Sequence, residues 1–154
     1  MPDGFKTIQV NRSRLVDLME ACYGKHYRFG AKVALDAAPS SFDECDCSGF
    51  VRWLLHGSTS DRLVIPDGSW NQHQWCRTNG FKPTDYSAVA GLKDSRLRIA
   101  FIEPRRGRAG HVWLIINGGT IESYGGHGPG RRGWNCKPLL SRVSACYVLT
   151  DPLP

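Results

Sequence analysis

The chain has 154 residues, of which 41% are hydrophobic and 22% are charged, and its formal net charge is +6 at pH 7. This composition excludes a largely disordered protein, and the length suits one hydrophobic core, so we expect a single domain over residues 1–154. No stretch approaches the roughly 20 apolar residues that a membrane-spanning helix needs, and the N-terminal segment lacks the apolar core of a secretion signal. We therefore expect a chain made in the cytoplasm without a signal peptide and without a membrane span.

Helical signals are concentrated in the first half of the chain. Apolar residues recur at helical spacing within residues 11–24 and again within residues 47–57, and each run ends at a glycine. Asp46 stands directly before the second run and is a favourable N-cap residue. A third, more polar helix is expected over residues 69–79.

The second half of the chain reads as strands. Four segments are rich in branched and aromatic residues and are bounded by Gly, Pro or Asn, and they cover residues 96–104, 110–117, 119–125 and 144–151. The Asn-Gly-Gly sequence between the second and third segments favours a tight hairpin, and the glycine-rich residues 124–133 are predicted to form a loop. Helices followed by strands predict an α+β fold, with N-terminal helices packed on a mainly antiparallel sheet.

Two cysteines near the second predicted helix differ in their expected chemistry. A cap at Asp46 places Cys47 at the first helical position, where the positive end of the helix dipole favours a thiolate. The free N–H groups of that first turn, beside Ser48, can face a developing oxyanion. Cys45 lies outside the cap and receives much less of this field. Cys47 is therefore the candidate nucleophile.

A thiolate nucleophile needs a proton shuttle, for which the sequence offers five histidines. His111 follows a glycine and opens the most apolar predicted strand, which would hold a catalytic base rigidly. His56 ends the helix of Cys47, roughly 13 Å away at 1.5 Å per residue, and is too far to help. His73 lies in the polar third helix and is expected at the surface.

Three segments resemble the NlpC-type cell-wall peptidases, a branch of the papain-like cysteine peptidases. They are residues 46–51 (DCSGFV), residues 27–30 (YRFG) and residues 110–123 (GHVWLIINGGTIES). The resemblance implies a papain-like NlpC-type fold and hydrolysis of an amide bond in the peptidoglycan stem peptide, commonly the bond between D-glutamate and a diamino acid. It also implies that neither a metal nor an organic cofactor takes part.

The resemblance assigns roles to individual residues. Cys47 is the nucleophile and His111 is its base and, later, the acid for the leaving amine. Tyr27 matches the family tyrosine that borders the oxyanion site, next to Asp46 and Ser48. The interval between Tyr27 and Cys47 is long for the family, so the segment between them is expected to reshape the substrate groove.

The third, ring-orienting position falls in the strand after the hairpin and has two candidates. A tight turn would place Glu122 opposite about Leu114 and leave His127 facing the start of the His111 strand. That register favours His127. A carboxylate, however, stabilises the imidazolium that forms during acyl transfer, and for this reason Glu122 is preferred. His127 stays the alternative.

Two rival interpretations remain from the sequence alone. The side chains of Cys45, Cys47, His73 and Cys76 are a set that zinc would accept, although the spacing is poor. The arginines of residues 104–108 and 130–134, with Trp70, Trp75 and Trp134 as stacking surfaces, could instead serve a non-catalytic module that binds cell wall or, with less support, nucleic acid. A cell-wall enzyme made without its own signal would need a phage tail or a secretion system for delivery, and an inhibitor protein is a further conceivable partner.

Overall fold

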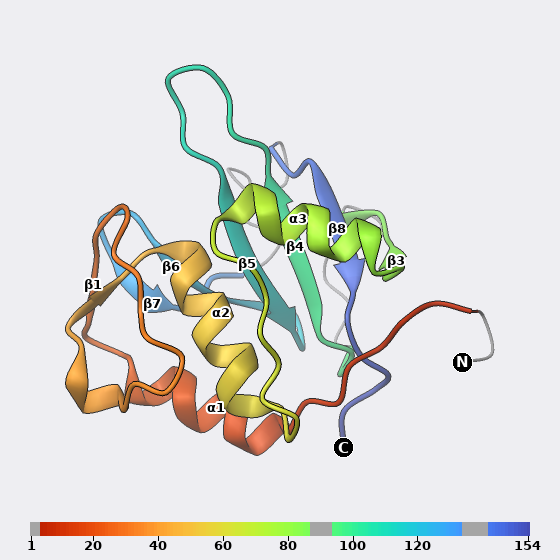
Figure 1. Ribbon diagram of the computed structural model, residues 1–154, viewed down its shortest axis with the longest axis horizontal. Coiled ribbons are helices and arrows are strands. Elements are labelled where there is room, and N and C mark those ends of the chain that lie inside the picture. The colour runs from red at the N-terminus through yellow and green to blue at the C-terminus, as the bar shows by residue number, and fades with distance from the viewer. Residues whose placement is uncertain (1–3, 87–93, 134–141) are drawn as a thin grey trace.

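The computed structural model describes residues 4–86, 94–133 and 142–154 (Figure 1). The helices are α1 (Arg12–Ala21), the short 3-10 helix η1 (Pro39–Ser41), α2 (Cys47–Ser58) and α3 (Ser69–Thr78). The strands are β1 (His26–Tyr27), β2 (Glu44–Cys45), β3 (Lys82–Pro83), β4 (Arg98–Ile102), β5 (His111–Ile116), β6 (Gly119–Tyr124), β7 (Gly128–Gly130) and β8 (Ala145–Val148). The predicted α+β fold is confirmed. None of the helices in the described ranges is both long and apolar enough to cross a bilayer.

One six-stranded antiparallel sheet organises the molecule, in the order β3-β8-β4-β5-β6-β7, and β1 and β2 form a separate parallel pair. The four predicted strands form its centre, as β8-β4-β5-β6. The prediction of a loop over residues 124–133 is wrong in part, since Gly128–Gly130 pairs with β6. Glycine suits this strand because Gly128 has a φ of 90° and approaches the backbone of Lys25 and His26, where a Cβ atom would have no room.

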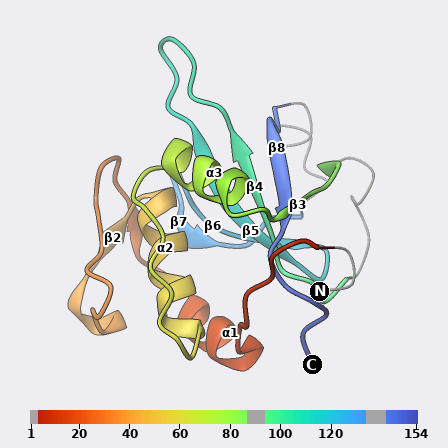
Figure 2. The same cartoon turned by 45° about the vertical axis from the view of Figure 1, so that its right-hand side comes forward.

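The helices lie together on one face of the sheet (Figures 1 and 2). Side chains alternate along the central strands, so that Phe101 and Leu114 face the helices and join the main core. Trp113 and Ile115 face the other way and form a smaller buried cluster. Burial on both faces explains why these strands read as nearly continuous apolar runs.

The turns between strands set the geometry of the sheet around His111 and Glu122. Asn117 and Gly118 both have positive φ, 51° and 77°, as the two central residues of a type I′ hairpin turn require. The closing pair is Ile116 with Gly119. The longer connection between β4 and β5 instead projects well away from the body of the molecule (Figures 1 and 2).

Candidate active site

The site begins at the N-terminus of α2, which is capped as the sequence predicts. The Asp46 side chain accepts a hydrogen bond from the Gly49 N–H at 2.7 Å, and Cys47 is the first residue of the helix. Cys47 is 7% exposed, so its thiol lies at the margin of the core and not sealed within it. The N–H groups at the very start of a helix have no intrahelical partner. The Cys47 thiol thus stands beside available backbone donors.

Two side chains that sequence reasoning missed hold this helix start in place. Lys32 donates to the Asp46 carboxylate at 2.7 Å and to the Ser48 hydroxyl at 3.0 Å. From α3, the fully buried Gln72 donates to the Ser48 carbonyl at 3.0 Å. These partners come from segments distant in the sequence, and no local pattern marks them. Asp46 and Ser48 are accordingly engaged in fixing the first turn of α2.

Tyr27 is carried to the same region by the β1–β2 pair, in which it is the partner of Cys45. Burial is the main reason that the pKa of Tyr27 rises to about 12, with smaller contributions from Cys47 and Asp46. The phenol therefore keeps its proton at neutral pH and can act as a hydrogen-bond donor.

Cys45 is a structural residue. It is fully buried, and its carbonyl accepts a hydrogen bond from the Ser123 hydroxyl at 3.0 Å. Burial raises the pKa of its thiol to about 11. The expected difference between the two neighbouring cysteines is thus visible in their surroundings, because only Cys47 occupies the capped helix start.

His111 lies at the start of β5 and joins Cys47 to Glu122. Its Nε2 atom is 2.7 Å from the Glu122 carboxylate, and its ring stacks on Trp113 with 5.2 Å between centroids. Burial by itself lowers the pKa of His111. Side-chain hydrogen bonds with the Cys47 thiol and with Glu122 outweigh it and raise the pKa to about 9. The imidazole is therefore held as a cation at neutral pH.

Glu122 is fully buried, and Arg132 holds it in place. The guanidinium of Arg132 donates to both carboxylate oxygens, at 2.6 and 3.0 Å, and lies over the Tyr124 ring at 4.2 Å. Although burial opposes ionisation, hydrogen bonds from His111 and Arg132 keep the pKa of Glu122 well below its ordinary value. The carboxylate is therefore charged and oriented from two sides.

The expected strand register was wrong by one residue. Leu114 pairs with Ile121 and not with Glu122, because the hairpin turn has two residues, where the expected register needs three. A shift of one residue moves a side chain to the other face of the sheet. The observed register brings Glu122 to the face that His111 occupies.

The alternative residue His127 is placed elsewhere. Its ring stacks on Tyr124 with 4.6 Å between centroids, and its Nδ1 atom lies 3.2 Å from the Gly128 carbonyl. The histidine hydrogen-bonded to Glu122 is His111. Of the two candidates, the structure brings Glu122 to His111.

The zinc interpretation has no support among the described residues, where no group of His, Cys, Asp and Glu side chains could hold a metal ion. His73, which was expected at the surface, is half-buried, stacks on Phe101 at 5.1 Å and lies 3.0 Å from the Tyr147 hydroxyl. Cys45, Cys47 and Cys76 are free thiols.

The basic segment at residues 130–134 is also not a simple solvated turn. Arg131 donates to the Ile116 carbonyl at 2.7 Å and to the Thr120 carbonyl at 3.0 Å, and Arg132 binds Glu122. Both guanidinium groups are therefore used within the protein. Trp134 and its predicted stacking role lie outside the described residues.

Comparison with solved structures shows which fold this arrangement of helices and strands has. An NlpC/P60 family protein from Bacillus cereus ATCC 10987 superposes with a TM-score of 0.61 at 18% identity, over 96% of this chain and 42% of that chain. A protein from Staphylococcus aureus subsp. aureus Mu50, described as similar to a lipoprotein of the NLP/P60 family, gives a TM-score of 0.57 at 15% identity, over 94% and 44%.

The chain therefore has the NlpC/P60 fold, as its resemblance to that family implies. It spans less than half the length of each of these two proteins. By sequence, no model of a known family matches the chain. No curated protein matches it either.

Proposed function

We propose that the protein is a cysteine peptidase that hydrolyses amide bonds in peptidoglycan stem peptides. One observation carries the proposal: His111, hydrogen-bonded to Glu122, interacts with the Cys47 thiol, which lies at the capped N-terminus of a helix. A cationic imidazole beside a cysteine favours the thiolate form of that cysteine, and a thiolate is the nucleophile that acyl transfer needs. The NlpC/P60 fold of the chain supports the choice of a cell-wall substrate.

In the first half of the reaction, the Cys47 sulfur attacks the carbonyl carbon of the scissile amide. The tetrahedral oxyanion is stabilised by N–H groups of the first turn of α2. His111 then transfers its proton to the leaving nitrogen, the C–N bond breaks, and a thioester on Cys47 remains. Glu122 keeps the ring oriented and stabilises its positive charge throughout.

In the second half, His111 takes a proton from water as that water attacks the thioester carbonyl. The C–S bond breaks, the carboxylate product leaves, and the proton on His111 restores the cationic imidazole beside the thiolate. The balanced outcome is one amide bond and one water converted into a carboxylate and an amine. The bond between D-glutamate and the diamino acid is the expected target.

Digestion of purified sacculi tests the proposal. Wild type and Cys47→Ser are incubated with sacculi, and the released muropeptides are resolved by intact mass spectrometry. Cys45→Ser is the matched control, because it changes the neighbouring thiol in the same way. We expect wild type and Cys45→Ser to produce cleaved stem peptides and Cys47→Ser to produce none while still binding sacculi. Equal amounts of cleaved stem peptides from Cys47→Ser and wild type would exclude Cys47 as the nucleophile, and no cleavage by either protein, with binding retained, would favour a binding module.

Delivery by a phage particle or by a secretion system remains a separate proposal. Detection of the protein in purified virions, or export that depends on a secretion apparatus, would support one route or the other. If the protein were neither found in virions nor exported by a secretion apparatus, both delivery routes would be excluded.

A further inference from the structure

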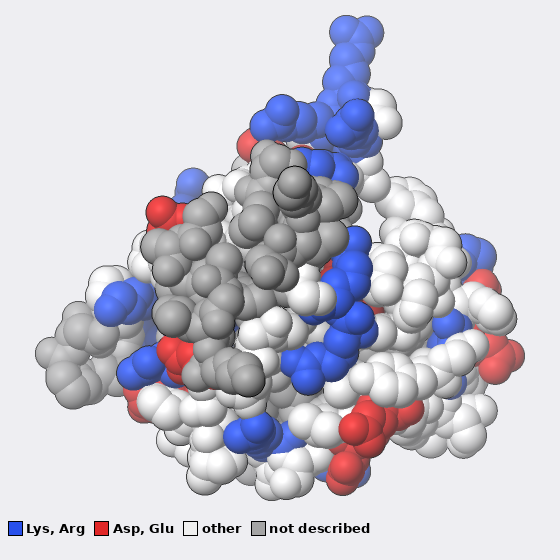
Figure 3. All heavy atoms as spheres, turned by 180° about the vertical axis from the view of Figure 1, so that it is seen from behind, with Lys and Arg blue, Asp and Glu red and all other residues white. Residues whose placement is uncertain are grey.

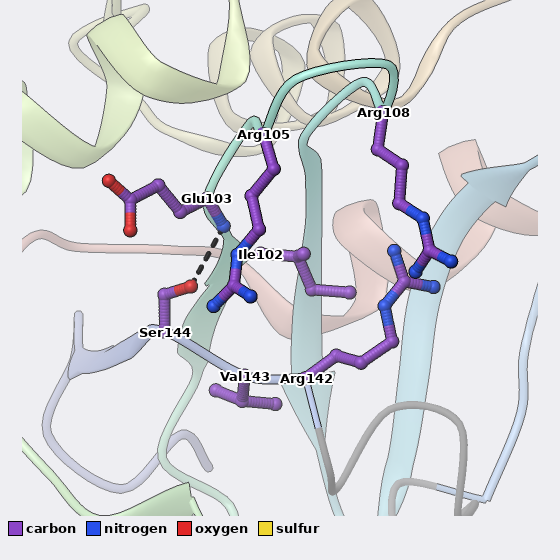
Figure 4. A pocket seen from close by; sticks show the side chains of 7 residues that line it. All are labelled: Ile102, Glu103, Arg105, Arg108, Arg142, Val143 and Ser144. Atoms are coloured by element: carbon purple, nitrogen blue, oxygen red, sulfur yellow. Dashed lines mark hydrogen bonds between the residues drawn. The ribbon is translucent and has the colours of Figure 1, made fainter.

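A pocket of about 330 Å³ lies at the base of the projecting β4–β5 connection, on the edge of the molecule next to β8. Three arginines and four other residues line it (Figure 4). The arginines are Arg105 and Arg108 from the β4–β5 connection and Arg142 from the segment that leads into β8. No part of the proposed reaction uses this pocket.

Backbone geometry places the three arginines around the pocket. Arg105 and Arg108 are bridge partners across the tip of the hairpin and exchange backbone hydrogen bonds of 3.0 and 2.8 Å. Directly opposite residues of an antiparallel pair project to the same side. On the other wall, the Ser144 hydroxyl accepts a hydrogen bond from the Glu103 N–H at 2.8 Å, which fixes the segment of Arg142 to the end of β4. The guanidinium groups of Arg108 and Arg142 point toward one another (Figure 4).

The positive charge of the pocket is not balanced by the part of the chain that the structure describes. Within residues 4–86, 94–133 and 142–154, no carboxylate forms an ion pair with Arg105, Arg108 or Arg142. Glu103 lines the pocket, but its carboxylate points away from the guanidinium groups (Figure 4). Seen from the face opposite the helices, Lys and Arg side chains gather at the projecting end of the molecule (Figure 3). Several positive charges around one pocket favour a bound anion.

The pocket is adjacent to the candidate active site. Its wall residue Ile102 is the β4 partner of His111 in the β4–β5 ladder. Partner residues in an antiparallel ladder share a face, with Cβ atoms about 4.5–5.5 Å apart. The pocket therefore borders the face of the sheet that His111 occupies, and a polymeric substrate bound at His111 would pass close to it.

We propose that Arg105, Arg108 and Arg142 form an anion-binding subsite for an oxygen-rich group, phosphate or carboxylate, carried by the cell-wall substrate. Guanidinium groups suit both anions because their N–H donors match paired oxygens. The inference rests on the proposed peptidase function for the identity of the polymer, while anion binding by the pocket can be measured without turnover.

The first experiment measures binding with inorganic phosphate and with acetate as probes. Side-chain N–H resonances of the arginines are followed by NMR while each salt is added at constant ionic strength, with chloride as the reference. We expect saturable shifts in wild type and affinity weaker by about tenfold or more in the double variant Arg108→Gln/Arg142→Gln, since each substitution removes charge-assisted hydrogen bonds.

The matched control is Arg106→Gln/Arg77→Gln, which removes the same charge. Arg106 lies in the same hairpin tip and Arg77 on the surface of α3, and neither lines the pocket. Unchanged affinity of this control for phosphate and acetate would show that the pocket arginines bind the anion specifically, and not through net charge alone. An equal loss in both double variants, or shifts no larger than those with chloride, would overturn the proposal.

The second experiment places the subsite in the reaction. Rates of wild type and Arg108→Gln/Arg142→Gln are compared on intact sacculi, on sacculi stripped of phosphate-bearing polymers, and on stem peptides whose free carboxylates are amidated. A wild-type advantage that disappears on stripping identifies phosphate as the anion, and one that disappears only on amidation identifies carboxylate. Equal rates of wild type and the double variant on intact sacculi would overturn the subsite. If the arginines bound the phosphates of an oligonucleotide while the double substitution left the rates on sacculi unchanged, the subsite would be overturned as well.

These outcomes are separable from failure of the peptidase proposal. If Cys47→Ser digests sacculi as well as wild type, the proposed mechanism fails and the polymer assignment fails with it, whereas phosphate binding by the pocket is unaffected. If Cys47→Ser is inactive and the arginine variant matches wild type, only the subsite fails.

Discussion

Replacing Glu122 by glutamine tests whether its charge sets the protonation of His111. The substitution keeps the shape of a fully buried side chain and removes its negative charge. The Arg132 guanidinium, whose side chain is 26% exposed, then loses its ion-pair partner, and His111 loses one of the two groups that raise its pKa.

The structure sets the size of the expected effects. Breaking a buried ion pair from one side costs about 3 kcal/mol or somewhat more, which corresponds to a fall in Tm of roughly 6–12 °C for a domain of this size. Cys47 still supports the imidazolium, so the pKa of His111 should fall from about 9 by at least about one unit, equivalent to about 1.4 kcal/mol. Peptidase activity should fall by about 10²-fold or more, because the ring loses its orienting charge.

Three measurements check these values: thermal unfolding at pH 7, an NMR pH titration of the His111 ring, and the rate of muropeptide release. Glu44→Gln is the matched control, because Glu44 forms an exposed ion pair with Arg28. Exposed pairs contribute about 0–1 kcal/mol, so this control should behave nearly as wild type. A Glu122→Gln protein whose Tm and His111 pKa both match those of the control would refute the reasoning.

Three further changes have expected outcomes. The pKa of His111 is raised on folding, so the contribution of His111 to the free energy of unfolding should be fully present just below about pH 6.5 and be lost as the pH rises to about 9. His111→Gln should lack this slope in urea titrations. Asp46→Ala should lower the free energy of unfolding by about 1 kcal/mol, because it removes the cap on the Gly49 N–H, and Asp46→Asn, which can still cap, should lower it less. Equal losses of stability for the two variants in chemical denaturation would contradict the capping role. Cys45→Ala should retain muropeptide release, while its free energy of unfolding falls by about 1 kcal/mol. Iodoacetamide at pH 8 should label Cys45 slowly, because burial raises the pKa of this thiol to about 11. Rapid labelling seen by peptide mass mapping would show that the thiol is accessible.

Local sequence signals were sufficient for the elements that carry Cys47 and His111. An acidic residue before an apolar helical run predicts a capped helix, and the structure has Asp46 bound to Gly49 with Cys47 at the first helical position. Branched residues bounded by glycine predict the strand that His111 opens. Caps and periodicities depend on residues only a few positions apart, so they can be recognised without knowledge of the fold.

Tertiary structure decided how these elements cooperate. The one-residue error in register shows the limit, because a two-residue and a three-residue turn are both compatible with the same Asn-Gly-Gly sequence, and only packing of the sheet selects the face of Glu122. Gly128–Gly130 was predicted as loop since its glycines carry no strand signal, and it pairs because β6 offers a free edge.

The sequence by itself determined the fold class, the capped cysteine and the strand-borne histidine, because these follow from spacing within single elements. Only the tertiary structure placed Lys32 on Asp46, Arg132 on Glu122, and Arg142 opposite Arg108. Each of these side chains meets a partner from another segment, and the distance between segments is set by packing of the whole core, which no local pattern of residues records.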